Sequence, residues 1–170
     1  MPITRLNHAV LYVQDAQRSA DFYAEVLGFR RLQVGPEGFT GAVFMQAPGS
    51  TNDHDLGLFT IDSQGQSPGR RVGLYHLAWE VDTLDELARL AGLLRKHGAL
   101  VGASDHGTTK SLYAKDPDGI EFEIAWLIPA DQLDADALEG RSTIRALDLE
   151  DEVRRYGGTT QGGIGVSSPA

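Results

Sequence analysis

Two histidines occupy matching positions in two similar segments of the chain. His8 is the third residue of LNHAVLYV, and His76 is the third residue of LYHLAWEV. A third candidate ligand, Glu123, lies in the apolar run IEFEIAWL. Because the chain has no cysteine, a hard or borderline metal ion could be held only by imidazoles and carboxylates. A single histidine in a strand is more often structural, but two at matching positions together with a glutamate favour a divalent metal site.

The same order of elements is predicted in both halves of the chain. In the first half the apolar patterns predict a strand, a helix and three extended segments at residues 6–13, 14–27, 29–34, 39–46 and 56–61. In the second half the same series falls at residues 74–81, 84–97, 99–103, 111–115 and 120–127. Asp15 and Gly28 are predicted to cap the first helix, and Gly98 to close the second. The matching histidines lie 68 residues apart (76 minus 8), so one βαβββ unit is predicted to occur twice.

Side chains alternate between the two faces of a strand, which predicts the neighbours of each candidate ligand. The shared faces are His8 with Val10 and Tyr12, His76 with Ala78 and Glu80, and Glu123 with Glu121 and Ala125. The opposite faces are apolar and are predicted to lie beneath the helices. The three candidate ligands are therefore predicted to point to the other side of the sheet, into a polar site. Glu121 is the alternative carboxylate, because it shares a face with Glu123.

The paired histidines and the glutamate of the last strand resemble the vicinal oxygen chelate superfamily, over residues 4–126. That superfamily includes extradiol dioxygenases, glyoxalase I, methylmalonyl-CoA epimerase and proteins of bleomycin or fosfomycin resistance. The resemblance implies an α+β fold in which two tandem βαβββ units form one module with a curved, cup-like mixed β-sheet. The expected domain is residues 1–128, with units at about 4–62 and 73–127. Residues 129–170 are expected to form an extension, with polar helices at 130–139 and 144–156 and a flexible tail from 157.

Residues 106–123 are similar to the signature that closes the active site of extradiol dioxygenases. A histidine, an aliphatic–tyrosine pair, an Asp-Pro-x-Gly turn and a final glutamate follow in order, with His106 and Tyr113 at the spacing of ring-cleaving members. Ser104 departs from the signature, which normally has Gly, Asn, Thr, Ile or Val there. The spacing of this motif also favours Glu123 over Glu121 as the ligand.

The resemblance implies that His8, His76 and Glu123 bind Fe(II), with Mn(II) or another divalent metal as alternatives. Two imidazoles and one carboxylate on one face of an octahedral ion leave three positions open, enough for a bidentate catecholate and O2. It further implies that His106 acts as an acid/base and that Tyr113 hydrogen-bonds a substrate oxygen. Extradiol enzymes often carry another catalytic histidine ahead of the second ligand, and His54 is the candidate for it, with its role left open.

Two other functions remain as alternatives. An isomerase of the glyoxalase or epimerase kind usually takes a fourth ligand, Glu or Gln, from the strand that corresponds to residues 56–61, and LGLFTI contains neither. A ligand-binding protein of the resistance type usually lacks the ligand set that His8, His76 and Glu123 supply. The leading prediction is therefore an extradiol, catechol 2,3-dioxygenase-like enzyme of aromatic compound catabolism, acting on a small aromatic diol with O2.

Charge and hydropathy limit the partners. The 170-residue chain carries a formal net charge of -9, which disfavours binding to nucleic acid and to anionic membrane surfaces. No apolar run approaches the roughly 18 residues of a membrane span, and the first residues lack a basic flank and a long apolar stretch. We expect a cytoplasmic protein, and the habit of the superfamily suggests a homodimer or a higher homo-oligomer.

Overall fold

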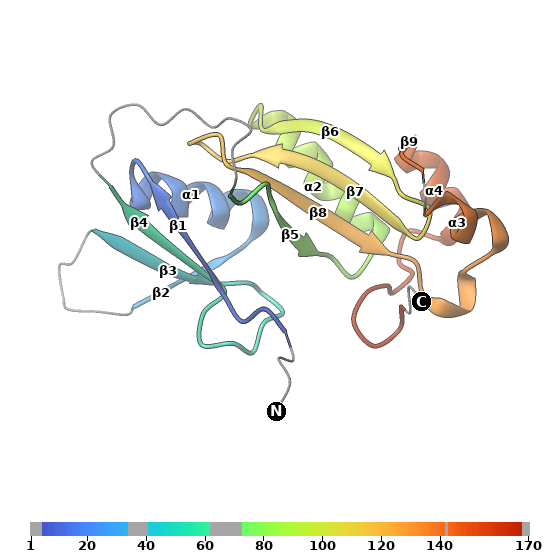
Figure 1. Ribbon diagram of the computed structural model, residues 1–170, viewed down its shortest axis with the longest axis horizontal. Coiled ribbons are helices and arrows are strands. Elements are labelled where there is room, and N and C mark those ends of the chain that lie inside the picture. The colour runs from blue at the N-terminus through green and yellow to red at the C-terminus, as the bar shows by residue number, and fades with distance from the viewer. Residues whose placement is uncertain (1–4, 34–40, 62–72, 142, 168–170) are drawn as a thin grey trace. The chain divides into compact units, whose positions relative to one another are not determined.

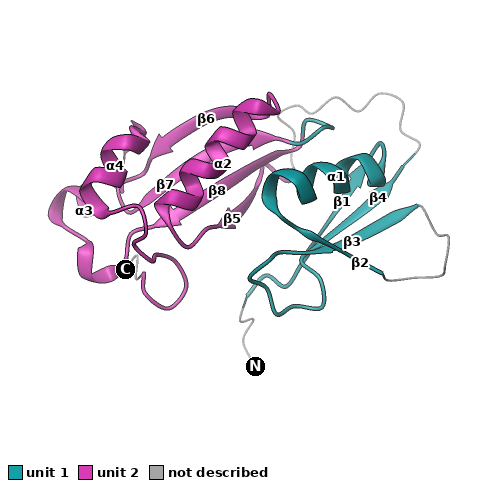
Figure 2. Cartoon of the chain, turned by 180° about the vertical axis from the view of Figure 1, so that it is seen from behind, with its two compact units in different colours: residues 1–69, 116–119 teal, residues 70–115, 120–170 magenta. Residues whose placement is uncertain are grey.

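The computed structural model describes residues 5–33, 41–61, 73–141 and 143–167 (Figure 1). The chain divides into two compact units, coloured separately in Figure 2. The first unit comprises Met1–Gly69 and Asp116–Gly119, and the second comprises Arg70–Lys115 and Ile120–Ala170. Phe39, predicted to start a strand, lies outside the described residues.

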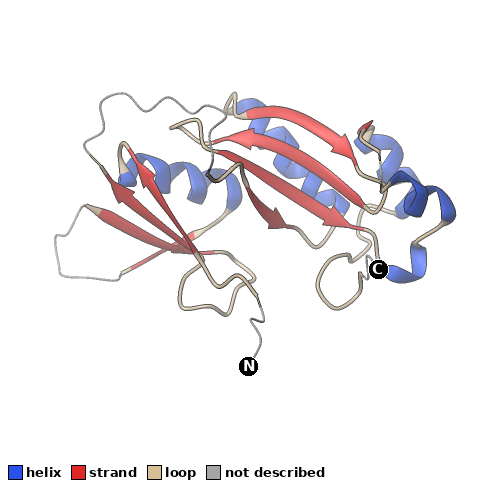
Figure 3. Cartoon of the chain, viewed as in Figure 1, coloured by secondary structure: helices blue, strands red, loops and turns tan. Residues whose placement is uncertain are grey.

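The first unit contains one complete βαβββ series. Its elements are β1 (Ala9–Val13), α1 (Ala16–Leu27), β2 (Arg30–Leu32), β3 (Ala42–Gln46) and β4 (Leu56–Thr60). The sheet order is β1-β4-β3-β2, in which β1 is parallel to β4 and the other pairs are antiparallel. Figure 3 shows the strands and the helix of this unit by type.

The ends of α1 are those that the sequence predicts. The Asp15 side chain accepts hydrogen bonds from the backbone N–H groups of Gln17 and Arg18, which satisfies donors that the first helical turn leaves free. The helix ends at Gly28, whose φ of 73° is a left-handed conformation that glycine adopts without steric cost. The helix therefore starts and stops on local signals.

The second unit repeats the series with the same topology. Its elements are β5 (Leu77–Glu80), α2 (Leu84–Lys96), β6 (Leu100–Asp105), β7 (Thr109–Lys115) and β8 (Glu121–Leu127). The sheet order is β5-β8-β7-β6, with β9 (Arg145–Ala146) added beside β6. As β1 does with β4, β5 pairs with β8 in parallel. The predicted α+β fold of two tandem βαβββ units is confirmed.

Burial alternates along β1 and the first half of β8 as the sequence predicts. In β1, Leu11 and Val13 are 6% and 1% exposed, whereas Val10 and Tyr12 are 50% and 70% exposed. In β8, Phe122 and Ile124 are buried, and Glu123 between them is half-buried on the other face. The buried faces form the cores with the helices, which leaves the predicted ligand faces outside those cores.

The C-terminal extension contains a short 3-10 turn (Ala130–Gln132), α3 (Ala135–Gly140), β9 and α4 (Leu149–Tyr156). The two longer polar helices predicted here are thus wrong in their bounds, because a turn precedes the first and a two-residue strand precedes the second. All of these elements belong to the second unit.

Part of the glycine-rich end of the chain is hydrogen-bonded to the rest of the second unit. In its described part, residues 157–167, Gly158 O accepts the backbone N–H of Asp85, and the Gly162 N–H donates to Asp82 O, both at 2.8 Å. A Cβ at Gly158 would lie 2.0 Å from Asp85 Oδ1. Glycines of this segment thus permit a close approach to the rest of the second unit.

No helix among the described residues is long and apolar enough to cross a membrane.

Candidate functional site

His76 and Glu123 meet at the start of the parallel β5–β8 pair. His76 directly precedes β5, and its Nε2 lies 3.1 Å from Oε2 of Glu123, with the two side chains 24% and 14% exposed. The other carboxylate oxygen, Oε1, accepts a hydrogen bond of 2.6 Å from the hydroxyl of the buried Ser111. Glu123 is therefore held with one oxygen facing the imidazole.

The His76–Glu123 distance fits two neighbouring ligands of one metal ion. Bonds of about 2.1 Å that meet at a right angle separate two ligand atoms by about 3 Å. An imidazole and a carboxylate also suit divalent ions such as iron and manganese. Nδ1 of His76 is buried without a hydrogen-bond partner among the described residues, so Nε2 is the nitrogen presented beside the carboxylate. Glu123 makes this contact, and its role as the carboxylate ligand stays a prediction.

The predicted catalytic pair borders these two residues within the second unit. Nε2 of His106 lies 2.9 Å from the hydroxyl of Tyr113. Tyr113 stands opposite Glu123 in the antiparallel β7–β8 register, and its ring centroid is 5.8 Å from that of His76. Of the three predicted ligands and the two predicted catalytic residues, the structure thus brings together all but His8.

The surroundings of Tyr113 keep its phenol neutral. Burial raises the pKa of Tyr113, and the nearby negative charge of Glu123 raises it further. Tyr113 therefore keeps its proton at neutral pH. It can donate a hydrogen bond to His106 when that nitrogen is the unprotonated one, or to an oxygen of a bound substrate.

In the first unit, His8 directly precedes β1 and contacts His54. The two ring centroids are 4.4 Å apart, and Asn52 Nδ2 ties the loop that carries His54 to the Asn7 carbonyl at 2.8 Å. Nδ1 of His8 lies 2.8 Å from Asn7 Oδ1, and Nδ1 of His54 lies 3.1 Å from Asp53 Oδ2. Each imidazole is thus oriented through Nδ1, which leaves Nε2 for another partner.

Two residues gain importance from the structure. The sequence left the role of His54 open, and its contact with His8 now places it beside a predicted ligand. Ser111 was not singled out at all. The pairing of β7 with β8 could have revealed it, because Ser111 pairs with Ala125, two residues from Glu123, and is thus its diagonal neighbour on the same face.

The two sheets can be superposed by register, which identifies the counterpart of Glu123. In the second unit Ala78 pairs with Glu123, and in the first unit the equivalent Val10 pairs with Gly57. A Cβ at Gly57 would lie 3.3 Å from Val10 Cγ2 and 3.5 Å from Phe44 Cε1. The first unit therefore has apolar groups and no carboxylate at the position that corresponds to Glu123.

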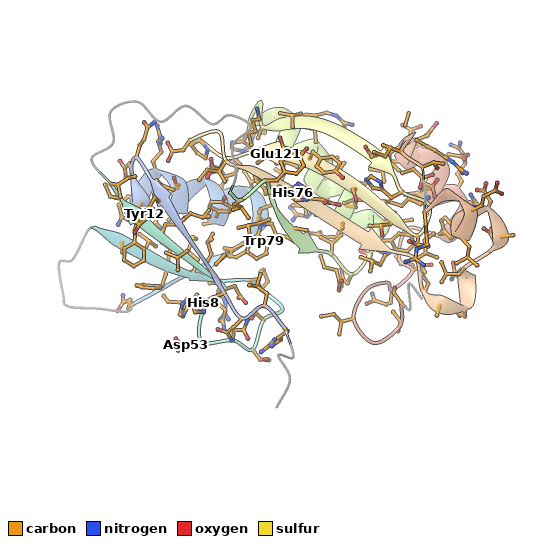
Figure 4. All side chains as sticks on the ribbon, in the orientation of Figure 1. His8, Tyr12, Asp53, His76, Trp79 and Glu121 are labelled. Carbon is orange, nitrogen blue, oxygen red and sulfur yellow. The ribbon has the colours of Figure 1, made fainter. Side chains whose placement is uncertain are left out.

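The predicted ligands divide between the units. His8 lies at the start of β1 in the first unit and His76 before β5 in the second (Figure 4). Within either unit, the described residues form no group of three or more His, Asp or Glu side chains that could hold a metal ion. The joint action of His8 with His76 and Glu123 stays a prediction.

Residues 5–124 match the family model described as the Glyoxalase/Bleomycin resistance protein/Dioxygenase superfamily. The chain belongs to this superfamily. The match runs from just before β1 into β8, the last strand of the second βαβββ series, which confirms the resemblance found in the sequence.

Relatives in this superfamily carry different activities. Catechol-2,3-dioxygenase of Bacillus subtilis (strain 168) is 31% identical over 125 residues, 71% of this chain but only 41% of the relative. Lactoylglutathione lyase of Neisseria meningitidis serogroup A is 34% identical over 125 residues, 70% of this chain and 88% of the relative. A glyoxylase/bleomycin resistance protein/dioxygenase domain from Frankia sp. EAN1pec shares the fold, with a TM-score of 0.65, 24% identity and coverage of 78% and 98%. The superfamily is thus established, and the reaction is a separate question.

Proposed function

We propose that the protein is a non-haem Fe(II)-dependent extradiol dioxygenase that opens a catechol-like ring with O2. The observation that carries the proposal is the His106–Tyr113 pair beside the His76–Glu123 pair. An acid/base pair next to potential metal ligands is the arrangement that proton removal from a catechol requires. The 31% identity to a catechol dioxygenase supports the same reaction class.

In this proposal His8, His76 and Glu123 hold the metal ion. The donor distance between His76 and Glu123 fits such a set, and the Asn7 contact leaves Nε2 of His8 available as the third donor. When bound, Fe(II) supplies coordination sites for the catechol oxygens and for O2. Mn(II), which suits carboxylate and water ligands, is the alternative.

The side chains of the chain itself handle protons and orientation. The neutral Tyr113 phenol donates a hydrogen bond to a catechol oxygen, which favours the deprotonated state of that oxygen. His106, in contact with Tyr113, takes up the proton that the catechol oxygen loses and gives it back. Ser111 fixes the Glu123 carboxylate through its hydrogen bond to Oε1. Within the first unit, His54 contacts His8.

Lactoylglutathione lyase activity is the second candidate, because the chain covers 88% of such a relative. An isomerase of that kind usually needs a fourth ligand from the strand that is β4 here. Gly57 and its apolar neighbours occupy the position that corresponds to Glu123. Without that fourth ligand, the metal ion keeps more open coordination positions for substrate and O2. This and the His106–Tyr113 pair favour the dioxygenase.

The testing experiment loads the purified protein anaerobically with Fe(II) and measures oxygen uptake and absorbance with catechol, 3-methylcatechol and 4-methylcatechol. In parallel, protein loaded with Ni(II) or Zn(II) is assayed for lactoylglutathione formation from glutathione and methylglyoxal. Oxygen uptake with a yellow ring-opened product supports the proposal. Lactoylglutathione formation without oxygen uptake would replace the dioxygenase with the isomerase. A protein that retains no metal and binds a ligand without turnover would instead be a resistance-type binding protein.

A further inference from the structure

The hairpin between β6 and β7 carries His106 at its tip. Asp105 ends β6, and its Oδ1 accepts the Gly107 N–H at 2.8 Å and the Lys110 ammonium at 2.5 Å. The backbone N–H of His106 donates to Thr109 O at 2.9 Å. The shape of this tip therefore depends on the Asp105–Lys110 ion pair.

Lys110 is a buried charge that needs compensation from more than Asp105. Its side chain is 1% exposed, and its Nζ lies 3.2 Å from Oε2 of Glu152 in α4. The ring of Tyr156, one helical turn along α4, has its centroid 5.8 Å from the same Nζ. Removing one partner from a buried ion pair leaves an uncompensated charge that drives local rearrangement. The C-terminal helix thus completes the charge balance of the hairpin.

The backbone of the extension also contacts the hairpin directly. In β9, Arg145 pairs with Asp105 at the end of β6 (Figure 1). Gly107, which follows His106, has a φ of 74°, and a Cβ there would lie 2.2 Å from Ala137 O in α3. A Cβ at Gly140 would lie 2.9 Å from Gly107 Cα. Helix α3 therefore lies directly against the residue that follows His106, with no space for a side chain between them.

We propose that the C-terminal extension positions His106, and that Glu152 is the positioning residue that acts through Lys110 and Asp105. The extension lies outside the family match at residues 5–124, so this is a feature of this chain beyond the βαβββ module. The consequence for turnover rests on the proposed function of His106. The positioning itself can be observed without any activity.

The test compares Glu152→Gln with Glu150→Gln, an equivalent change at an exposed position of the same helix. In the full-length chain without added metal, side-chain NMR signals of the five histidines are assigned by single His→Asn variants. We expect Glu152→Gln to move the His106 signals and leave those of His97 in place, while Glu150→Gln moves neither. Gly140→Ala, which pushes on Gly107 without changing a charge, moves the His106 signals as well. If Glu152→Gln and Gly140→Ala lower the melting temperature but leave the His106 signals unmoved, the proposal is overturned.

Kinetics of the Fe(II)-loaded protein give the second readout. We expect Glu152→Gln to lower kcat for catechol by about 10-fold or more, as a displaced catalytic group does, with KM and bound iron nearly unchanged. Equal kcat in both glutamine variants, with moved His106 signals, contradicts the catalytic consequence. If neither the parent nor any variant cleaves catechols, the proposed function fails, and the NMR comparison still decides whether α4 positions His106.

Discussion

The hydroxyl of Tyr113 lies 2.9 Å from Nε2 of His106, across the β6–β7 hairpin. The same phenol has a raised pKa because it is buried close to the Glu123 carboxylate. The phenol thus keeps its proton beside an imidazole nitrogen. In the proposed function, this pair handles protons next to the candidate ligands His76 and Glu123.

Variants of this pair are expected to separate metal binding from turnover. His106→Ala keeps the metal and slows turnover by roughly 10²- to 10⁴-fold, the range that general acid–base catalysis supplies. Tyr113→Phe also keeps the metal and lowers kcat. Because the two groups contact each other, the double variant loses less than the product of the two single losses. Steady-state kinetics with iron analysis check this, and fully multiplicative losses would mean that the residues act independently.

Ser111→Ala is expected to weaken metal binding without abolishing it. The hydroxyl fixes Glu123 Oε1, and loss of such an orienting hydrogen bond typically costs about 10- to 100-fold in metal affinity. Glu123→Ala, which removes the ligand itself, abolishes metal retention. Competition with a chelator measures the metal affinity of each variant. The control is Ser19→Ala, which changes a buried serine of α1 in the first unit. Equal metal affinity in Ser111→Ala and Ser19→Ala would remove the role of Ser111.

Gly162→Ala is expected to destabilise the fold. Its new Cβ would lie 2.1 Å from Leu127 O and 2.6 Å from Trp126 Nε1, so the C-terminal segment must shift. Such overpacking costs about 1–3 kcal/mol of unfolding free energy. Gly92→Ala, inside α2 with open space around it, is the matched control and should stabilise slightly. Urea denaturation measures both, and an unchanged stability of Gly162→Ala would show that residues 157–167 are not held against the second unit.

Stability at alkaline pH is expected to depend on Tyr156. Burial raises the pKa of Tyr156 to about 12, whereas an unfolded tyrosine has a pKa of about 10. Below about pH 10 Tyr156 is protonated in both the folded and the unfolded state, and its contribution to stability is fully present. Between these values the unfolded chain releases a proton that the folded chain keeps, so stability falls as pH rises. Urea midpoints from pH 8 to 11 should decline less steeply in Tyr156→Phe, and parallel curves would refute the assignment.

The sequence predicted features that depend on neighbouring residues. Alternation in β1 gave the buried Leu11 and Val13 and the exposed Val10 and Tyr12. The caps at Asp15 and Gly28 were equally local, since each is decided within one helical turn. The repeat of this pattern in the second half was enough to predict the order of elements.

Contacts that depend on register or loop closure were beyond the sequence. The Ser111–Glu123 hydrogen bond requires the β7–β8 register, and the His8–His54 contact requires the loop that Asn52 ties to the start of β1. The backbone hydrogen bonds of Gly158 and Gly162 to Asp85 and Asp82 were also beyond the sequence, because composition cannot distinguish glycines that allow motion from glycines that allow close packing.

The most direct test of the central claim is a turnover of the Fe(II)-loaded protein with catechol under ¹⁸O2. The product is reduced at once, so that its aldehyde oxygen cannot exchange with water, and is analysed by mass spectrometry. The account predicts a ring-opened product that carries both atoms of one labelled O2, and loss of that product in Glu123→Ala. Intact catechol, or a product without label, from protein that retains its iron would contradict the account.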